Sequence, residues 1–217
     1  MTIIILTSCV NVIKNIDSMY QKNKDERIKI YLKSVLKWLQ FTNFKIILVE
    51  NSGYPFDELN NEKIIYKERF EVITFITSKI KQTDYLQKIT SKGAHEIFSI
   101  NYAFQNSKII QSSDFIIKIT ARYFIKDLEN FLSNYDLNNY ECLTQNNRDR
   151  CEMVGCHYKH FLYIFNMYLI NKDNKFEHCI EKVWKFRTSK YDKILICDTF
   201  DIEKTQRGGF NQFYSTI

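Results

Sequence analysis

Two cations and a hydroxyl group alternate along one short stretch of the chain. Lys118, Thr120 and Arg122 occur in the run Phe-Ile-Ile-Lys-Ile-Thr-Ala-Arg. Side chains two residues apart on a strand project to the same face, so we expect these three to share one face. Cations arranged in this way neutralise phosphate groups directly. The alternative is that Lys118 pairs with a buried acid, because a lysine among isoleucines is costly to bury alone, and that Arg122 is a surface cation.

A second candidate anion site lies at the start of a predicted helix. Lys92 and Glu96 are four residues apart in Ser-Lys-Gly-Ala-His-Glu. Backbone amides at a helix N-terminus favour anions, so Lys92 can meet a phosphate there. The alternative is an ordinary exposed ion pair in the first turn.

The elements that must hold these residues follow from the spacing of apolar residues. Apolar, β-branched runs predict strands at 2–6, 44–49, 70–75 and 114–120, and spacings of three and four predict helices at 25–41 and 94–106. This alternation indicates an α/β fold with a mostly parallel sheet flanked by helices. In such sheets ligands bind beyond the carboxyl ends of the strands.

Polar residues follow the predicted strands at that edge. Thr7 and Ser8 end the first strand, with Asn11 shortly after, and Glu50 and Asn51 end the second. Such side chains can hydrogen-bond a ribose or a base. The alternative for 50–53 is a turn that favours Asn, Ser and Gly.

The region after residue 124 shows a looser pattern. We expect a short helix at 127–132, an all-round apolar segment at 161–170, a helix at 176–186, a strand at 194–197 and a polar tail at 205–209. No second core is evident. The prediction is therefore a single domain over 1–217, in which 1–124 is one half and 125–217 is an extension that completes a cleft.

Composition and missing motifs exclude several classes. Thirty-one Lys and Arg against 25 Asp and Glu give a net charge of +6, which favours anionic ligands without singling out nucleic acid. P-loop and glycine-rich dinucleotide motifs do not occur. No leader and no apolar run of spanning length occurs, so we expect a soluble, cytoplasmic protein with no membrane span.

The six cysteines are expected to be reduced thiols in such a protein. Cys151, Cys156, His157 and His160 form a C-x4-C-H-x2-H pattern. Zinc sites usually contain a paired C-x2-C element, which this pattern lacks. We therefore expect packed thiols, with a zinc site as the alternative.

The order of elements over residues 2–124 resembles the nucleotide-sugar-binding half of GT-A glycosyltransferases. The segment 91–123 and the closing Thr-Gln-Arg-Gly-Gly are also similar to small uncharacterised glycosyltransferase-like proteins of bacteria and large DNA viruses. The resemblance implies a nucleotide-sugar donor and a glycan or other hydroxyl acceptor. Implied donor-binding residues are Thr7, Ser8, Asn11, Glu50, Asn51, Lys92, Glu96, Lys118, Thr120 and Arg207.

The resemblance also suggests catalytic residues. The polar run 146–152 follows the strand that corresponds to the diphosphate-binding one, where these enzymes form their acceptor side. Asp149 and Glu152 are the candidates for the carboxylate that deprotonates an acceptor hydroxyl, and Arg122 for compensating the leaving phosphate. The alternative is a solvated charged loop. Arg207-Gly208-Gly209 can fold over the donor or form a plain C-terminal loop.

One departure concerns metal. Most GT-A enzymes hold a divalent ion with an Asp-x-Asp at the end of the fourth strand, where this chain has Lys118, Thr120 and Arg122. We therefore predict no cofactor; Mn2+ or Mg2+ would need carboxylates from elsewhere, such as Asp149 or Asp198. Two alternatives stay open: another α/β nucleotide-using enzyme such as a nucleotidyltransferase, and a non-catalytic module that binds nucleic acid or a partner. The sequence leaves the sugar, nucleobase, acceptor and oligomeric state undetermined.

Overall fold

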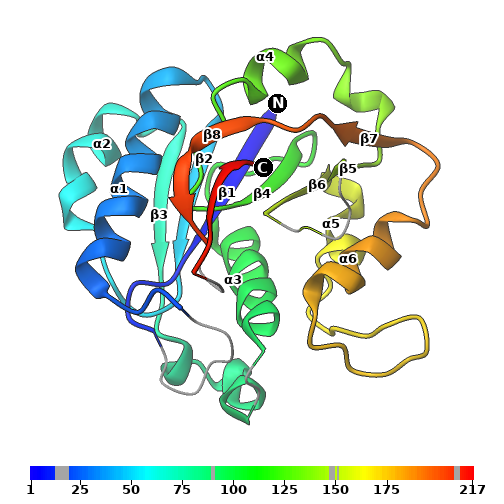
Figure 1. Cartoon of the computed structure of the whole chain (residues 1–217), viewed down its shortest axis with the longest axis horizontal. Coiled ribbons are helices and arrows are strands. Elements are labelled where there is room, and N and C mark those ends of the chain that lie inside the picture. Colours follow the sequence, from blue (N-terminus) through cyan, green and yellow to red (C-terminus); the bar gives the residue numbers. More distant parts are fainter. Residues whose placement is uncertain (13–19, 89–90, 147–149, 151, 208–210) are drawn as a thin grey trace.

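A seven-stranded sheet forms the centre of the molecule in a computed structural model of the chain (Figure 1). The structure describes residues 1–12, 20–88, 91–146, 150, 152–207 and 211–217. The strand order is β3-β2-β1-β4-β6-β5-β7, and a separate hairpin joins β8 and β9. Every pairing in the large sheet is parallel except those of β6 with β4 and β5. The fold class predicted from the sequence is confirmed.

The helices and strands of the first half occur where the apolar spacing predicts them, within one to two residues. Their bounds are β1 Thr2–Ser8, α1 Lys24–Phe41, β2 Lys45–Glu50, α2 Asn60–Ile65, β3 Phe70–Thr74, α3 Lys92–Asn106 and β4 Phe115–Thr120. The apolar spacing does not predict α2, and none of its residues is buried.

The second half extends the same sheet. Its elements are α4 Leu128–Ser133, β5 Cys142–Gln145, β6 Met153–His157, α5 Phe161–Ile164, α6 Ile180–Thr188, β7 Ile194–Cys197, β8 Asp201–Gln206 and β9 Phe213–Thr216. The sequence analysis does not predict β5 and β6, because both strands are short and end in polar residues.

Two sequence predictions in this half are wrong. The expected helix at 176–186 begins only at Ile180, because the backbone of 169–177 instead forms a turn in which Glu177 N donates to Leu169 O at 2.8 Å. The polar tail at 205–209 begins inside β8, which pairs with β9.

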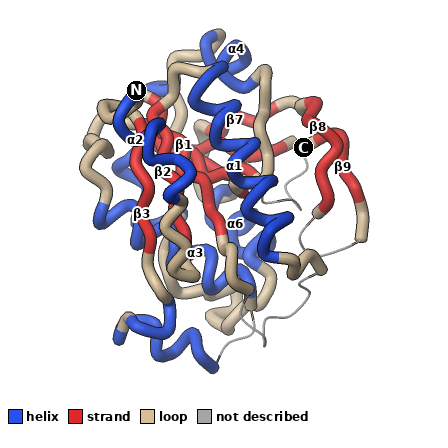
Figure 2. Tube along the Cα trace, turned by 90° about the vertical axis from the view of Figure 1, so that its left-hand side faces the viewer, coloured by secondary structure: helices blue, strands red, loops and turns tan. Residues whose placement is uncertain are grey.

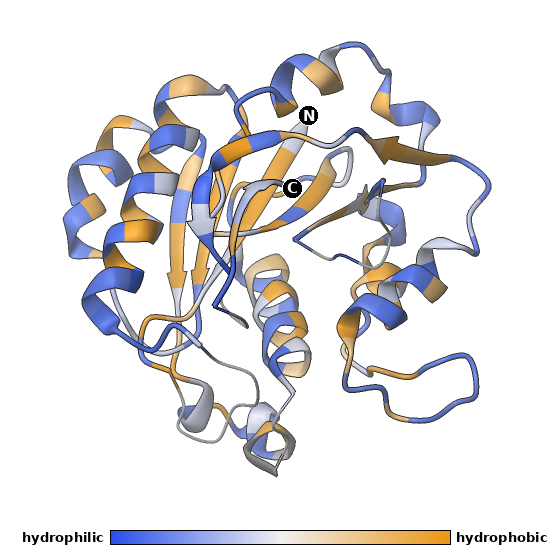
Figure 3. Ribbon diagram, in the orientation of Figure 1, coloured by the Kyte–Doolittle hydropathy of each residue, from blue (hydrophilic) through white to orange (hydrophobic). Residues whose placement is uncertain are grey.

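The core has two layers, one on each face of the sheet. On one face, α1 buries Tyr31, Val35 and Trp38 against β1, β2 and β4. On the other face, α3, α5 and α6 pack together, with Ile97 and Trp184 buried among them. Figure 3 shows the resulting pattern, in which the central strands are apolar along their length and the helices alternate between apolar and polar residues.

Close contact between α3 and α6 fixes the helix ends nearest the carboxyl edge of the sheet. Ser91 caps α3 by accepting from Ala94 N at 3.4 Å. A Cβ atom on Gly93 would lie 2.6 Å from Cβ of Ile180, so only glycine allows this approach. The start of α3 is thereby held against the start of α6.

The described part of the chain contains no helix that is both long and apolar enough to cross a bilayer. Among its described cysteines, Cys9, Cys156, Cys179 and Cys197 are free. Cys142 and Cys156 are buried opposite each other on β5 and β6, and Cys151 of the candidate zinc pattern lies outside the described residues. Within these residues no three His, Cys, Asp or Glu side chains are grouped so as to hold a metal ion.

Candidate active site

Four neighbouring chain segments end together at one edge of the sheet. Thr7 of β1 is in register with Val49 of β2 on one side and with Thr120 of β4 on the other. Thr120 N donates to Glu152 O at 3.1 Å, which continues the row into the segment before β6. Thr7, Thr120 and Glu152 therefore lie side by side at the carboxyl edge, where ligands bind in open α/β sheets.

A buried ion pair lies directly behind this row. Lys118 Nζ is 2.7 Å from Glu96 Oε1, and Thr7 Oγ1 donates to the same oxygen at 2.7 Å. Lys118 is fully buried and also donates to Thr120 Oγ1 at 3.3 Å. The Glu96 side chain is 21% exposed. The buried ammonium group of Lys118 therefore pairs with an acid, which is the alternative that the sequence leaves open.

The aromatic ring of Trp184 completes the surroundings of this lysine. Lys118 Nζ lies 5.2 Å from the ring centre, a favourable cation–π distance. α6 thus supplies a wall for the ion pair, and Glu96 is held by β1, β4 and α3 together. A carboxylate fixed by two donors keeps its orientation toward the edge of the sheet.

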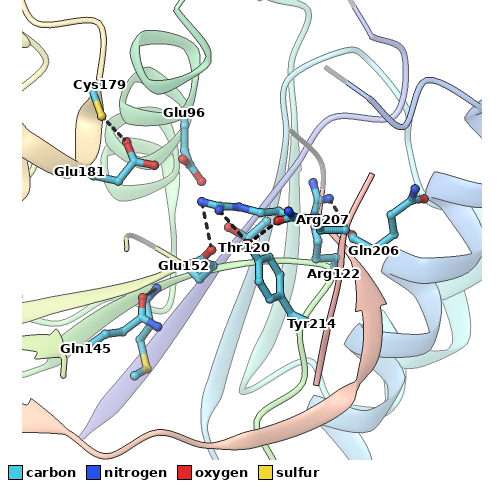
Figure 4. A network of polar contacts seen from close by, with 12 residues as sticks. Glu96, Thr120, Arg122, Gln145, Glu152, Cys179, Glu181, Gln206, Arg207 and Tyr214 are labelled. Atoms are coloured by element: carbon cyan, nitrogen blue, oxygen red, sulfur yellow. Dashed lines mark hydrogen bonds and ion pairs between the residues drawn. The ribbon is translucent and has the colours of Figure 1, made fainter. Parts of the chain in front are cut away.

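Arg207 reaches the site from the end of β8. Its Nη2 lies 3.6 Å from Glu152 Oε1, and its Nη1 donates to the Tyr214 hydroxyl at 3.1 Å. Figure 4 shows Arg207 between Glu152 and Tyr214, with Glu96, Thr120 and Arg122 drawn around it. The predicted tail is thus a strand end that brings a cation to the carboxyl edge.

Arg122 and Lys92 add further positive charge. Arg122 Nη1 donates to Gln206 O at 3.4 Å, which ties it to the residue before Arg207. Burial lowers the pKa of Lys92, and the positive charges of Arg122 and Arg207 lower it further, against the opposing effect of Glu181. Arg122 is thus joined to the strand end that carries Arg207, and Lys92 begins α3, whose N-terminus lies at the same edge of the sheet.

Glu50 organises the loops over β1 and β2. Its carboxylate is fully buried and accepts from the backbone amides of Val10 at 2.8 Å, Ser52 at 2.9 Å and Tyr54 at 2.8 Å. It also accepts from the Ser52 hydroxyl. These bonds join two loops that are far apart in sequence. The buried carboxylate of Glu50 therefore fixes the loops at the carboxyl edge of the sheet.

The other predicted contacts for a base or ribose differ in accessibility. Ser8 Oγ donates to Val49 O at 2.9 Å, and Asn51 Nδ2 donates to Ser99 Oγ at 3.0 Å. Asn11 is exposed, and its backbone N donates to Ser52 Oγ at 2.8 Å. Of these, Asn11 has the side chain most open to a ligand.

The sequence analysis did not predict several residues that lie at or near this edge. Gln145 accepts from Met153 N at 3.1 Å, and Glu181 accepts from Cys179 Sγ at 3.1 Å. Tyr214 and Trp184 contact the cations described above. None lies in a recognisable motif; a polar residue at the end of a short strand is the one signal that could have indicated Gln145. Asp149, a predicted catalytic residue, lies outside the described residues.

The charges do not suit a divalent metal ion. The end of β4 carries Lys118 and Arg122 but no carboxylate. Glu96 is already paired with Lys118, and Glu152 with Arg207. Mg²⁺ and Mn²⁺ require carboxylate and water oxygens as ligands. Fixed cations at the site would repel these metal ions.

Comparison with known proteins was made on sequence and on structure. No protein-family profile and no curated protein sequence matches the chain. A solved structure of a putative nucleotide-diphospho-sugar transferase from Desulfovibrio desulfuricans G20 matches with a TM-score of 0.50 and 12% identity, covering 91% of this chain and 79% of that one. An active-site mutant of LgtC matches with a TM-score of 0.50 and 10% identity, covering 91% and 72%.

The chain has a GT-A-like fold. The match extends over nine-tenths of the chain, so β5 to β7 belong to this fold as well as the first half. At 10–12% identity the likeness concerns the arrangement of the backbone. What this GT-A-like chain binds follows from its own side chains.

Proposed function

We propose that the protein is a glycosyltransferase that moves a sugar from a nucleotide-sugar donor to a hydroxyl group of a glycan or another acceptor. The observation that carries the proposal is the position of Arg122 and Arg207 at the carboxyl edge of a GT-A-like sheet, with Lys92 at the start of α3. A nucleotide sugar presents a diphosphate that needs such compensation. The free thiols of Cys9, Cys156, Cys179 and Cys197 support a cytoplasmic location.

The reaction assigns a separate task to each end of the donor. Asn11, Ser8 and Asn51 lie on the β1–β2 side and are proposed to bind the base and ribose. The bond between the sugar and the diphosphate breaks, and the electron pair leaves with the phosphate oxygen. The guanidinium groups of Arg122 and Arg207 stabilise the charge that develops there, as fixed donors do in other transfer reactions.

The acceptor oxygen forms the new bond to the sugar carbon and must lose its proton. Glu152 is proposed as the carboxylate that takes it, because it lies beside Thr120 at the edge and is held by Arg207. Asp149 remains the second candidate. Lys118 and Glu50 are proposed to position Glu96 and the loops without touching the ligand.

The chain's residues do not fit the divalent ion that the fold family usually employs, so we derive no step through a metal. Arginine and lysine supply the compensation instead. The proposal therefore includes no cofactor.

A thermal-shift experiment tests the proposal directly. The protein is heated with UDP, GDP, CMP and dTDP sugars, each with Mn2+ and with EDTA. A donor at a hundredfold excess over its dissociation constant stabilises the folded state by about 2.7 kcal/mol. We expect one of these nucleotide sugars to stabilise the protein equally in Mn2+ and in EDTA. When acceptors are added, the protein should transfer the sugar and release the nucleotide.

A matched pair of variants controls for charge. Arg122→Gln removes a cation from the site, whereas Lys190→Gln removes an exposed cation that stacks on Phe186 at 4.9 Å on α6. Only the first should abolish the stabilisation. The proposal fails if no nucleotide sugar stabilises the protein while an oligonucleotide does, or if a nucleoside triphosphate with Mg2+ is consumed instead.

A further inference from the structure

Ion pairs to α1 and backbone hydrogen bonds hold the hairpin of β8 and β9 on the side away from the site. Glu203 accepts from Lys37 at 2.8 Å and also pairs with Lys33, and both lysines belong to α1. Phe200 and Ile217 exchange two backbone hydrogen bonds of 2.9 Å each. Figure 2 shows the hairpin along one side of the molecule, next to α1. Its other end is thereby held over the carboxyl edge of the sheet.

Tyr214 on β9 gathers two arginines at that end. The guanidinium carbon of Arg150 lies 5.1 Å from the ring centre, and that of Arg207 lies 5.5 Å from the same centre. The hydroxyl accepts from Arg207 and donates to Gln212 Oε1 at 3.3 Å. The residues come from the β5–β6 connection and from both strands of the hairpin, so only the tertiary fold brings them together.

Two like charges on one ring repel each other, and Glu152 supplies a carboxylate beside Arg207. The ion pair of Arg207 with Glu152 is long at 3.6 Å. The second oxygen of Glu152 is buried and has no hydrogen-bond partner among the described residues. Arg122, tied to Gln206, adds a third guanidinium, and its Nε is buried and also lacks a partner there. An anion with several oxygens would relieve this arrangement.

We propose that Arg150 and Arg207, both positioned by Tyr214, form a clamp for the diphosphate of the donor. The inference rests on the proposed function and adds two residues to it. Each guanidinium can bind one phosphoryl group through two parallel hydrogen bonds. Two guanidinium groups held against one ring suit the two linked phosphoryl groups of a diphosphate better than they suit a single phosphate. Tyr214 acts as a positioning residue.

Inorganic pyrophosphate is the probe, and inorganic phosphate is its comparison. Binding of each to the full chain is measured by titration calorimetry at several salt concentrations. We expect pyrophosphate to bind more tightly than phosphate. Removing one charge-assisted phosphate contact should weaken pyrophosphate about tenfold or more, so we expect this loss for Arg150→Gln, together with a weaker salt dependence.

Variants of Tyr214 separate the ring from the hydroxyl. Tyr214→Leu, which removes the ring against which both arginines lie, should weaken pyrophosphate binding as strongly as Arg150→Gln. Tyr214→Phe keeps the ring and should weaken it less. Lys204→Gln is the matched control, because Lys204 is exposed on the same hairpin and stacks on Phe213 at 5.7 Å; its affinity should not change. If Tyr214→Leu does not fold, Arg150→Gln and Tyr214→Phe still decide the question.

The clamp is refuted if folded Arg150→Gln binds pyrophosphate as the unaltered protein does, or if phosphate binds as tightly as pyrophosphate. Nucleotide sugars that bind and turn over normally in Arg150→Gln would refute the clamp and leave the proposed function standing. Conversely, a pyrophosphate clamp in a protein that no nucleotide sugar stabilises would support the clamp and overturn the proposed function.

Discussion

Replacing Lys118 with methionine tests how the site is supported. The ammonium group is fully buried, 2.7 Å from Glu96 Oε1, and methionine would fill most of its space beside Trp184. Removing one partner of a buried ion pair costs about 3–5 kcal/mol. Because the Glu96 side chain is 21% exposed and can be rehydrated, we expect a loss near the lower limit, about 3 kcal/mol.

Urea denaturation followed by fluorescence measures this loss. In a thermal melt of a protein of this size, 1 kcal/mol corresponds to roughly 2–4 °C in melting temperature. The melting temperature of the variant should therefore fall by roughly 6–12 °C. Adding Glu96→Gln removes the unpaired charge, and the double variant should recover about 1–3 kcal/mol relative to the sum of the single effects. Lys37→Met is the matched control; its surface pair with Glu203 is 33% and 52% exposed, and its loss should be about 0–1 kcal/mol.

The reasoning is refuted by one particular result. If Lys118→Met loses less than about 1 kcal/mol while donor binding disappears, the ammonium group contacts the ligand directly. The buried pair would then have to open when the donor binds.

Three further predictions concern packing, pH and metal. Gly155→Ala would place a Cβ atom 2.9 Å from Ile117 Cγ1 and 3.0 Å from Ile116 O, so urea denaturation should show a loss of about 1–3 kcal/mol; an unchanged midpoint would mean that β4 and β6 can separate easily. We expect protonated Lys92 to contribute to pyrophosphate binding, and the pKa of Lys92 is lowered, first by burial and then by Arg122. Binding measured by calorimetry should therefore be complete below this lowered pKa and weaken as pH rises through it, at a lower pH than for an ordinary lysine, whereas Lys92→Arg should remove this step; the same step in the variant would rule out Lys92 as its source. Donor turnover and melting temperature should be the same in EDTA as in Mn2+, because the end of β4 offers cations and no carboxylate to a metal; activity abolished by EDTA and restored by Mn2+ would direct attention to Glu152 and Asp149.

The sequence by itself determined the layout of the first half. Runs such as Thr-Ile-Ile-Ile-Leu are typical of strands covered on both faces, and the spacing of Ile28, Leu32, Val35 and Leu39 predicts one apolar helix face. These signals are local, because each depends on burial along a single element. They were enough to indicate the sheet edge at which Thr7, Thr120 and Arg122 lie.

The tertiary structure decided which of those side chains face the site. Lys118 and Glu96 are on different elements, and whether the lysine met a ligand or an acid depended on how α3 packs against β4. The β8–β9 hairpin has polar, half-exposed strands, so no periodicity predicts it. Its strands are held by pairing with each other and by contacts to α1 and the β4–α4 connection.

The cation cluster likewise exists only in the folded chain. Arg150, Arg207 and Tyr214 have no common motif, and their meeting requires that the β5–β6 connection and the hairpin end over the same edge. A charged residue has no local preference that reveals its partner, since its energy depends on the charges and water around it in space. Sequence patterns therefore determine where the edge of the sheet forms, and long-range packing decides which charges meet there.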